Sequence, residues 1–562
     1  MIKQYRFDEF DKASKSQWTD KLNQDLGADL ARRISSWTSE RNLTLSAYYD
    51  QEDVGKDINV PVRPVEGWKY IEPLHPERTN AQVLDALMSG ADGLMLTDSH
   101  VRRLNKVLGQ VAPEYCTLAL KASGFPIYHQ FVEWWIDRHP ENGQGEVLLF
   151  GDKQRAEQFS IISKAFDIGH ALGHRTIHID GAWVQTQGGS SHLELGYILS
   201  QSVYYINSLL DLGYDIQVIA RGMFVATSMG SSYFLALTKL RSIRLLISQL
   251  FKLYGLSEVY TPIHASTSLF TKSALDSNTN FLRCTSEAMS AVLGGADYIS
   301  ITPAHELKSA DRIARNISNL MKEESLLDKV TDPAAGSYYL DYLTDLLSQQ
   351  AWNTFQQVEK RGGYEVATKE KYFEKEIQKD LEFQQSRLAS GRRKMVGVND
   401  FGNQSEKVSL ATLDNDRTTI SKNFEEVRKQ VEASVEGQGE AYRPVVYLLP
   451  VGTNAKMITA RHTFVSNFFN WAGFIVKPYQ DEISTPMMGV VACCGADEDY
   501  TKEQIDSALN GIDTACILIA AGNITEGSSS KISTWIHAKT DRLEGVINIL
   551  NQMGITSNSL QS

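Results

Sequence analysis

The stretch TIHIDGAWVQTQGG (residues 176–189) contains the unit on which the fold is built. A short apolar run ends at Asp180-Gly181 and opens into a loop rich in glutamine and glycine that carries a large aromatic residue, Trp183. A helical pattern follows, HLELGYILSQSVYYINSLLDLG (192–213). In proteins that repeat a strand and a helix, ligands bind on the loops after the carboxyl ends of the strands. The loop with Trp183 is therefore the first place to look for function.

The same alternation of strand and helix continues on both sides of this stretch. Eight apolar runs have strand length: WKYIEP (68–73), GLMLT (93–97), CTLALK (116–121), EVLLF (146–150), TIHID (176–180), IQVIA (216–220), VYTPI (259–263) and YISIT (298–302). Helical patterns lie between most of them; Ser191 and Glu194 have the spacing of a capping box, and Gly213 and Gly255 are expected to end helices. Eight strands alternating with helices over about 250 residues are typical of a (β/α)8 barrel. We predict this barrel over residues 66–345.

The segments on either side of the barrel lack its regular alternation of strands and helices. Residues 1–65 lack the alternation; an amphipathic helix is predicted from Ala13 to Leu26, and we expect the whole segment to be an arm that wraps its own domain or a partner. Residues 346–440 are predicted as a helical segment and linker. Its most polar part, KEKYFEKEIQKDLEFQQSR (369–387), fits a solvated helix on the outside of the barrel, and residues 402–440 are expected to form a flexible linker.

A second alternation occupies residues 441–562. Its five strand-like runs are VVYLLPVG (445–452), FIVKPY (474–479), MGVVACCG (488–495), ACILIAAG (515–522) and TWIHA (534–538). Five strands with helices between them predict a doubly wound, flavodoxin-like domain. This domain looks pared down, because GNITEGSSSKIS (522–533) replaces one helix and the connection from Tyr479 to Met488 is too short for another.

Composition excludes several classes of partner. The chain has 562 residues, with 42% hydrophobic and 22% charged residues, which is ordinary for a soluble protein. Its net charge of −12 argues against non-specific binding to nucleic acid or to an anionic membrane.

The five cysteines lack metal-ligand spacing, so no metal site is expected, and they favour a reducing, cytoplasmic compartment. MIKQYRFDEFDK (1–12) lacks the apolar core of a signal peptide, and no run is long enough to span a bilayer.

The barrel carries a few residues of types that act in catalysis or bind ligands. His178 lies within a predicted strand, and His264 and His305 lie near strand ends, where histidine is a candidate acid or base. None has an obvious carboxylate partner in the sequence. Arg221 directly follows a predicted strand and fits either an acidic ligand or a structural ion pair. Trp183 fits either stacking on a ligand or closing the barrel mouth.

The second domain shows no clearer candidates for catalytic or ligand-binding residues. Its loops show no glycine pattern that would cradle a phosphate, and its first histidine, His462, falls well inside a helical pattern. The residues by themselves thus predict an architecture and no catalytic constellation.

Four stretches of the chain resemble the methylmalonyl-CoA mutase family of cobalamin-dependent enzymes. They are WTSERNLTLSAYY (37–49), FLRCTSEAMSAVLGGADYISITPAHE (281–306), SADRIARNISNLMKEESLLDKVTDPAAGSYYLDYLT (309–344) and SGRRKMVGVNDF (390–401). The resemblance covers nearly the whole chain, and it is greatest to the small, non-catalytic subunits of the two-subunit members. It implies the order of parts predicted above: an arm, a barrel, a helical linker and a cobalamin-binding-like domain.

Two features of the catalytic subunits that face the substrate are missing. Catalytic subunits carry a tyrosine in an Arg/Gly/Pro/Tyr-rich stretch near the first barrel strand, where this chain passes directly from WKYIEPLHPERT (68–79) to NAQVLDALMSGADGLML (80–96). They also carry a Ser-Gly-Tyr-His-like sequence after the fifth strand, whose histidine acts on the thioester carbonyl. Here Trp183 occupies the histidine position. An indole cannot exchange a proton at neutral pH.

The cofactor features of the family are missing as well. Cobalamin-binding members have Asp-x-His-x-x-Gly after the first strand of the second domain, and the imidazole coordinates cobalt. The matching segment here is NAKMIT (454–459), in which Lys456 stands near the histidine position; a protonated lysine has no lone pair for a metal. The later loops differ too, at Cys493 and at Ala520-Ala521-Gly522. The resemblance therefore implies no catalytic and no cofactor-binding residue in this chain.

The resemblance implies a catalytically silent subunit with a structural role. Its partner would be a homologous large subunit that binds adenosylcobalamin and interconverts methylmalonyl-CoA and succinyl-CoA. We expect the arm to wrap this partner, and the side chains of Leu96, Leu120, Phe150 and Ile179 to help fill the silent barrel. A vestigial pocket is expected around Trp183, Gln185 and Arg221. Two alternatives stay open: an active acyl-CoA mutase, and a module that binds CoA esters without chemistry.

Overall fold

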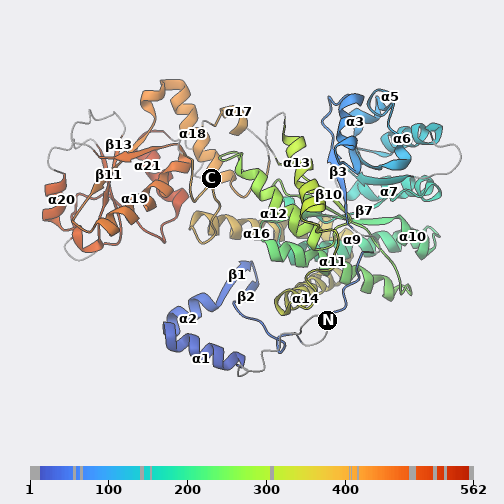
Figure 1. Ribbon diagram of the computed structural model, residues 1–562, viewed down its shortest axis with the longest axis horizontal. Helices are drawn as coiled ribbons and strands as arrows, with labels where there is room; N and C mark the ends of the chain where they lie inside the picture. The colour runs from blue at the N-terminus through green and yellow to red at the C-terminus, as the bar shows by residue number, and fades with distance from the viewer. Residues whose placement is uncertain are drawn as a thin grey trace.

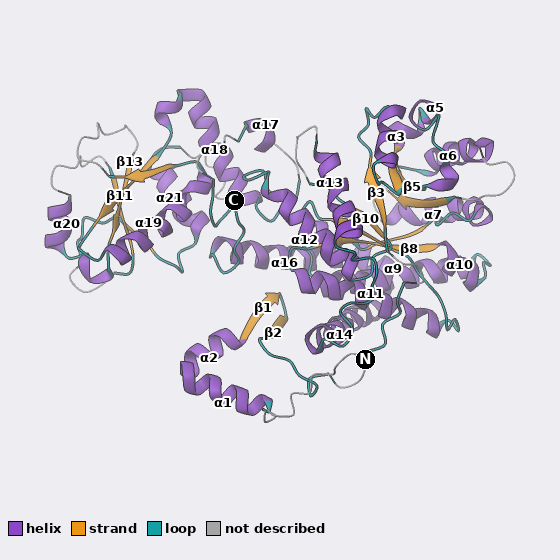
Figure 2. Ribbon diagram, viewed as in Figure 1, coloured by secondary structure: helices purple, strands orange, loops and turns teal. Residues whose placement is uncertain are grey.

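The chain folds into an arm, a barrel and a second parallel sheet, with long helices between the barrel and the second sheet (Figure 1). This computed structural model describes residues 13–54, 58–63, 67–138, 145–151, 155–303, 309–403, 406, 408–413, 417–479, 489–509, 516–524 and 528–555. Figure 2 shows the strands gathered in two separate places, the barrel and the second sheet, apart from a small hairpin in the arm.

The arm contains two helices and a hairpin: α1 (Lys15–Leu26), α2 (Ala28–Ser35), β1 (Ser36–Glu40) and β2 (Leu43–Ser46). Helix α1 confirms the predicted amphipathic helix and starts with a capping box between Ser14 and Gln17. It buries none of its residues, and Figure 1 shows α1 and α2 standing away from the barrel. The hairpin returns to the body of the protein, where Arg41 Nε contacts Asp380 Oδ1 at 2.6 Å.

Eight parallel strands form the barrel. They are β3 (Lys69–Pro73), β4 (Gly93–Thr97), β5 (Thr117–Ala122), β6 (Glu146–Gly151), β7 (Ile177–Asp180), β8 (Met223–Met229), β9 (Ile263–Thr267) and β10 (Tyr298–Ser300). The sheet order is β6-β5-β4-β3-β10-β9-β8-β7, and a bridge between Leu148 and Arg175 joins its two ends. The predicted (β/α)8 barrel is confirmed.

One predicted strand is wrong. IQVIA (216–220) lies in helix α10 (Ile216–Gly222), whose cap Asp215 accepts a hydrogen bond from the Gln217 amide at 2.7 Å. The strand is the next apolar run, Met223–Met229, which is buried throughout. A short apolar run fits a buried strand and one face of a helix equally well, and the aspartate cap was the signal that distinguished them. The seventh barrel strand also starts later than predicted, at Ile263.

Helices cover the outside of the barrel. They are α3 (Asn80–Met88), α4 (Asp98–Val101), α5 (Leu104–Val107), α6 (Phe125–Arg138), α7 (Arg155–Gly169), α8 (Ala182–Thr186), α9 (Ser191–Asp211), α11 (Tyr233–Leu253), α12 (Thr279–Leu293) and α13 (Ala310–Asn319). Gly213 and Gly255 follow helices at φ +91° and +86°, as predicted. The predicted capping box of Ser191 and Glu194 is wrong, because α9 starts one residue earlier, at the cap Ser190, and the Glu194 carboxylate is buried against Lys239.

The barrel interior is filled by one cluster of side chains: Ile71, Met95, Ala119, Leu148, Phe150, Phe224, Ala226 and Tyr298. Of the four residues expected inside, only Phe150 belongs to it. Leu96, Leu120 and Ile179 are buried in the clusters between the strands and the outer helices. Successive side chains of a strand point to opposite faces of the sheet. For these three residues the predicted inward-facing set was wrong by one position, and their side chains face the outer helices.

Three long helices occupy the segment after the barrel: α14 (Tyr338–Lys360), α16 (Tyr372–Ala389) and α18 (Lys422–Gln438), with the shorter α15 (Gly363–Lys369) and α17 (Leu410–Leu413) between them. Helix α16 is not merely solvated, since Asp380 on it is buried and accepts a hydrogen bond from the Ser190 amide at 2.8 Å. The flexible linker predicted over 402–440 is wrong for 422–438. There α18 buries Phe424, Val427 and Val431 in the core of the second sheet.

The second sheet has five parallel strands: β11 (Val445–Pro450), β12 (Ile475–Pro478), β13 (Gly489–Cys494), β14 (Ile517–Ala521) and β15 (Thr534–Ile536). Their order, β12-β11-β13-β14-β15, is that of flavodoxin, as predicted. The helices are α19 (Ala455–Phe469), α20 (Lys502–Ala508) and α21 (Arg542–Gln552). No helix occurs between β14 and β15 in the described residues there, and most of the short connection expected from Tyr479 to Met488 lies outside the described residues.

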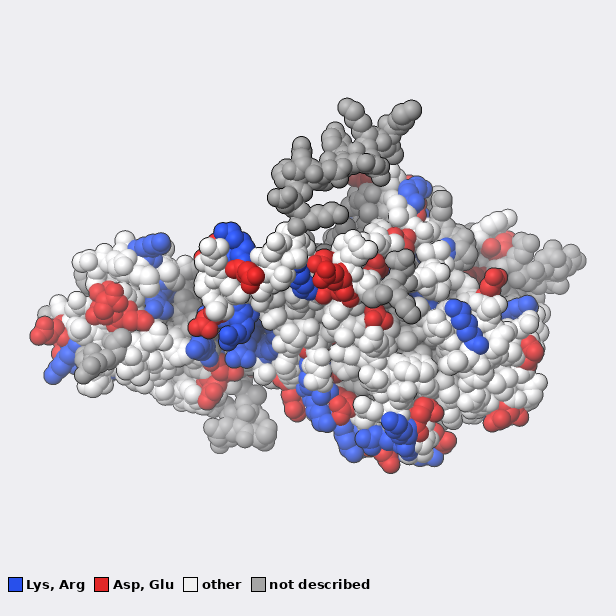
Figure 3. All heavy atoms as spheres, turned by 90° about the horizontal axis from the view of Figure 1, so that it is seen from below, with Lys and Arg blue, Asp and Glu red and all other residues white. Residues whose placement is uncertain are grey.

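The surface agrees with an acidic, mixed-charge protein. On the face seen in Figure 3, the described Lys and Arg side chains alternate with Asp and Glu, so no continuous basic surface of the kind that binds nucleic acid appears there. Within the described part of the chain, no helix is both long enough and apolar enough to cross a membrane.

Candidate functional site

Trp183 lies on α8, a short helix directly after β7. Its amide donates to Asp180 Oδ1 at 3.3 Å, and its indole packs 5.5 Å from the ring of Tyr197 on α9. The side chain borders a buried cluster that α9 shares with α14, α15 and α16 and that includes Tyr364 and Phe373. Trp183 thus packs between the barrel and its helical cover, where it is half-buried.

His178 and His264 fill the barrel interior. Their rings lie 4.9 Å and 5.1 Å from the ring of Phe150, and His178 stacks on Phe224 at 5.1 Å. His264 Nε2 shares a hydrogen bond of 2.9 Å with Ser300 Oγ. Burial, with a smaller effect of Lys121, lowers the pKa of each imidazole to about 3. Both histidines are therefore neutral packing residues at physiological pH. His305 lies outside the described residues.

Arg221 stands at the wrong end of the barrel for the expected pocket. It lies in the last turn of α10, two residues before β8, and therefore at the amino end of the strands, whereas Trp183 and Gln185 follow the carboxyl end of β7. Its side chain is exposed, and its backbone carbonyl accepts a hydrogen bond from Arg175 Nη1 at 2.5 Å. The misplaced strand over 216–220 produced this error. The structure does not bring Arg221 together with the other two residues.

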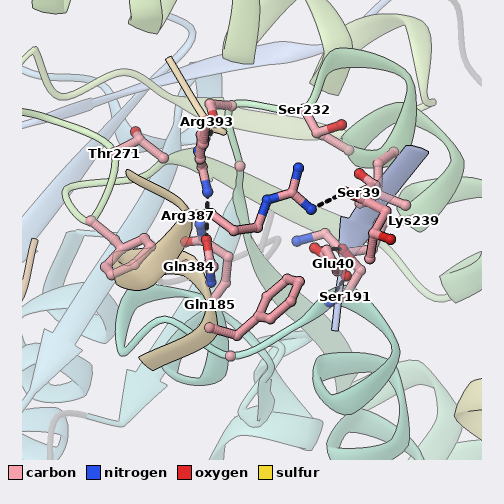
Figure 4. A pocket seen from close by; sticks show the side chains of 18 of the residues that line it. Ser39, Glu40, Gln185, Ser191, Ser232, Lys239, Thr271, Gln384, Arg387 and Arg393 are labelled. Atoms are coloured by element: carbon pink, nitrogen blue, oxygen red, sulfur yellow. Dashed lines mark hydrogen bonds between the residues drawn. The ribbon is translucent and has the colours of Figure 1, made fainter. Parts of the chain in front are cut away.

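A pocket of about 320 Å³ lies at the carboxyl end of the barrel strands (Figure 4). Its lining comes from β1 of the arm, α8, the loops after β8 and β9, the first turns of α9 and α11, and the end of α16 with the residues that follow it. Gln185 is the one predicted pocket residue in this lining. Glu40, Lys239, Arg387 and Arg393 join it from segments that are far apart in the sequence.

The polar groups of this pocket are held by specific bonds. The Glu40 carboxylate accepts hydrogen bonds from the Ser191 amide at 2.8 Å and the Ser191 hydroxyl at 2.9 Å, and burial raises its pKa to about 7. Lys239 Nζ contacts Glu194 Oε2 at 2.6 Å and donates to the Ser228 carbonyl at 2.6 Å. Both charges of this ion pair are buried. The pocket therefore contains Lys239, which belongs to a buried ion pair, and the Glu40 carboxyl group, whose pKa of about 7 is close to neutral pH.

Reasoning from the sequence missed these lining residues, although a signal was present. Glu40 belongs to WTSERNLTLSAYY (37–49), and Arg393 belongs to SGRRKMVGVNDF (390–401), two of the stretches that resemble the family. Neither stretch shows by itself that the other lies beside it.

The carboxyl end of the second sheet holds a network of its own. Asp497, after β13, accepts hydrogen bonds from Arg461 Nη2 at 2.8 Å and from Asn523 Nδ2 at 2.9 Å. The Tyr500 hydroxyl donates to the Ala521 carbonyl at 2.8 Å and accepts from the Gly495 amide at 2.8 Å. These bonds connect the loops on which flavodoxin-like domains hold their ligands.

Metal ligands do not gather at this sheet. Lys456 is exposed in the first turn of α19, whose cap is Asn454. Cys493 is buried in β13, and burial raises its pKa to about 12, so it remains a protonated thiol. His462 is half-buried on α19. Among the described residues, no group of three or more His, Cys, Asp and Glu side chains is placed to hold a metal ion.

Comparison with known proteins agrees with the architecture. The sequence model of a family described as methylmalonyl-CoA mutase matches residues 157–440. The methylmalonyl-CoA mutase small subunit of Porphyromonas gingivalis is 26% identical over 98% of this chain and 99% of its own length, and that of Streptomyces virginiae is 26% identical over 97% and 98%. The large subunit from Porphyromonas gingivalis is 28% identical over 44% of this chain and 36% of its own length. The chain belongs to the methylmalonyl-CoA mutase family.

Proposed function

We propose that this chain is the non-catalytic small subunit of a heterodimeric methylmalonyl-CoA mutase, with a homologous large subunit as its partner. The observation that carries the proposal is the extent of the similarity. Proteins named as small subunits match this chain over 98% and 97% of its length, whereas large subunits match over 43% and 44%. The role we assign to this chain is to support the subunit that interconverts methylmalonyl-CoA and succinyl-CoA.

The barrel interior supports a silent subunit. Phe150, Phe224, His178 and His264 pack ring against ring inside it, at centroid distances of 4.9 to 5.1 Å. A barrel that admits the long arm of a CoA ester needs space along its axis, and these side chains take that space. Trp183, at the position of the family's catalytic histidine, packs outside the axis against Tyr197.

Adenosylcobalamin is the cofactor of this family's mutases, and we propose that this chain binds none. The residue near the family's cobalt-binding position is Lys456, whose ammonium group has no lone pair to donate. The bonds of Asp497 and Tyr500 already connect the loops around the expected cofactor site. The residues present therefore do not fit the cofactor, and we assign it to the large subunit.

The arm supports binding of a partner. Helix α1 buries none of its residues, and the exposed fractions of Leu26, Leu30, Ile34 and Trp37 are 39%, 45%, 49% and 45%. Leu30 and Ile34 are four residues apart on α2, so they share one face of that helix. A row of exposed apolar side chains on a projecting arm is typical of a surface that another chain covers. We propose that the large subunit covers it.

We also propose a cytoplasmic location for the complex. Four cysteines, Cys116, Cys284, Cys493 and Cys494, are buried thiols that form no disulfide. Unpaired thiols in this number are usual in a reducing compartment.

Coexpression with a homologous large subunit tests the proposal. We expect a stable heterodimer in size-exclusion chromatography, with all the corrinoid absorbance in the large subunit after the two chains are separated. A Leu30→Asp/Ile34→Asp variant should weaken the heterodimer, whereas Met88→Asp, at an apolar residue that is 88% exposed on α3, should not. Corrinoid that stays with this chain alone after desalting would contradict the proposal.

A further inference from the structure

Three arginines border the pocket without an acidic partner. Arg387 Nη1 donates to the Thr38 carbonyl, and Arg393 donates to Ser231 Oγ at 2.6 Å and to Gln384 Oε1 at 2.8 Å. Arg392 is exposed at the rim. In the described part of the chain, none of the three forms an ion pair with Asp or Glu. The pocket therefore presents guanidinium groups that form no ion pair, although the Glu40 carboxyl group belongs to the same lining.

Burial is the main influence on the titration of two of these groups. It lowers the pKa of Arg393 to about 10, with a contribution from Arg387 and against the opposing effect of Glu40. Burial and the charge of Arg392 lower the pKa of Arg387. A bound anion would act in the opposite direction and raise both pKa values.

The rest of the lining offers hydrogen-bond donors and three aromatic rings, those of Trp37, Phe270 and Phe383. Ser231 and Ser232 supply hydroxyl groups from the loop after β8, whereas the Thr271 hydroxyl already donates to the buried Glu287 carboxylate. Helix α11, of 21 residues, starts at this wall, and no side chain caps its first amides. Arginines, hydroxyls and a helix amino end are the groups that bind phosphate in proteins. Trp37 and Phe383 lie in the same lining and supply apolar faces for a ring.

We propose that this pocket binds a phosphate group, either free or carried by a small organic molecule whose ring contacts Trp37 and Phe383. Its volume of about 320 Å³ is at the lower end of the range for small-molecule sites. Figure 4 shows Arg393 on one side of the pocket, Glu40 and Ser191 on another, and the Arg387 side chain reaching toward Ser39 of the arm. The ligand would contact both the arm hairpin and the barrel, and would therefore fix the position of the arm. The site goes beyond the proposed subunit role and shares Trp37 with the arm surface assigned to the large subunit.

Calorimetry on the purified full-length chain tests the proposal, with inorganic phosphate, AMP and succinate as probes. We expect saturable phosphate binding that weakens as salt is raised. Tighter binding of AMP than of phosphate would assign the site to an organic phosphate, and equal binding would assign it to free phosphate; both support a phosphate site. Succinate that binds as tightly as phosphate would overturn the assignment to phosphate.

Variants localise the binding. Arg392→Gln and Arg387→Gln should each weaken phosphate binding roughly tenfold, as expected for the loss of a charged hydrogen bond. Arg102→Gln, at an exposed arginine next to α4, is the matched control and should bind as the wild type does. Arg392 makes no hydrogen bond in the described structure, so its variant tests the proposal even if Arg387→Gln fails to fold. Unchanged binding in Arg392→Gln, or no saturable binding of phosphate to the wild type, would overturn the proposal.

Discussion

Removal of the Lys239 ammonium group should be among the most destabilising single changes in the barrel. Lys239 Nζ lies 2.6 Å from Glu194 Oε2, and the two side chains are only 2% and 0% exposed, so water screens neither charge. The variant Lys239→Met keeps most of the side-chain volume and leaves Glu194 charged and buried. The loss of one partner from a buried ion pair costs about 3 to 5 kcal/mol. We expect the free energy of unfolding of the barrel to fall by that amount at pH 8.

The destabilisation should depend on pH in a defined direction. Burial raises the pKa of Glu194 above its ordinary value of 4.5 even in the wild type, and without Lys239 the pKa should rise further. The folded variant then binds more protons than the unfolded chain at pH values above 4.5, so its stability decreases as pH rises through this range. The difference from the wild type should therefore be smaller at pH 5 than at pH 8.

Urea unfolding at the two pH values measures both effects. Lys252→Met is the matched control, since Lys252 is exposed near the end of the same helix, α11; its effect should stay within about 0.5 kcal/mol. The double variant Lys239→Met/Glu194→Gln should regain much of the lost stability, because no unpaired charge remains buried. A loss below about 1 kcal/mol for Lys239→Met, or an equal loss at pH 5 and pH 8, would refute the reasoning.

Three further predictions concern the silent site and the helical cover. Under the proposed function, Trp183→His should show no mutase turnover when the isolated chain is incubated with adenosylcobalamin and methylmalonyl-CoA, because Lys456 near the family's cobalt-binding position has no lone pair for the metal; detectable succinyl-CoA would contradict this. Gly196→Ala should lower the melting temperature, since its Cβ would lie 2.6 Å from the Thr354 side chain on α14, whereas Gly437→Ala on α18 meets no atom within 4 Å and should stabilise by up to about 1 kcal/mol. Phe424→Ala should cost about 3 to 5 kcal/mol in urea unfolding, because α18 is packed into the core; a loss typical of a surface residue would restore the linker interpretation.

Local patterns in the sequence predicted the architecture. Six of the eight barrel strands were placed to within two residues at either end, because each is a short apolar run between polar turns. IQVIA has the composition of a strand but folds as helix α10, because Asp215 before it caps a helix. Which residues of a strand face the barrel axis could not be predicted from composition. Leu96 and Met95 are equally apolar, but only Met95 belongs to the interior cluster.

The sequence by itself determined the family and the order of the parts, because continuous stretches of the chain carry both. It also predicts that Trp183 and Lys456 stand at or near the positions of the family's catalytic and cobalt-binding histidines, and this stays a prediction. Only the tertiary structure decided which charged side chains lie close to one another. The pocket unites residues 37–40 of the arm with residues 231–239 and 383–394, segments separated by about 150 to 200 residues. No local pattern encodes that Arg387 and Arg393 converge without an acidic partner, because their environment arises only when the arm hairpin, the barrel and α16 pack together.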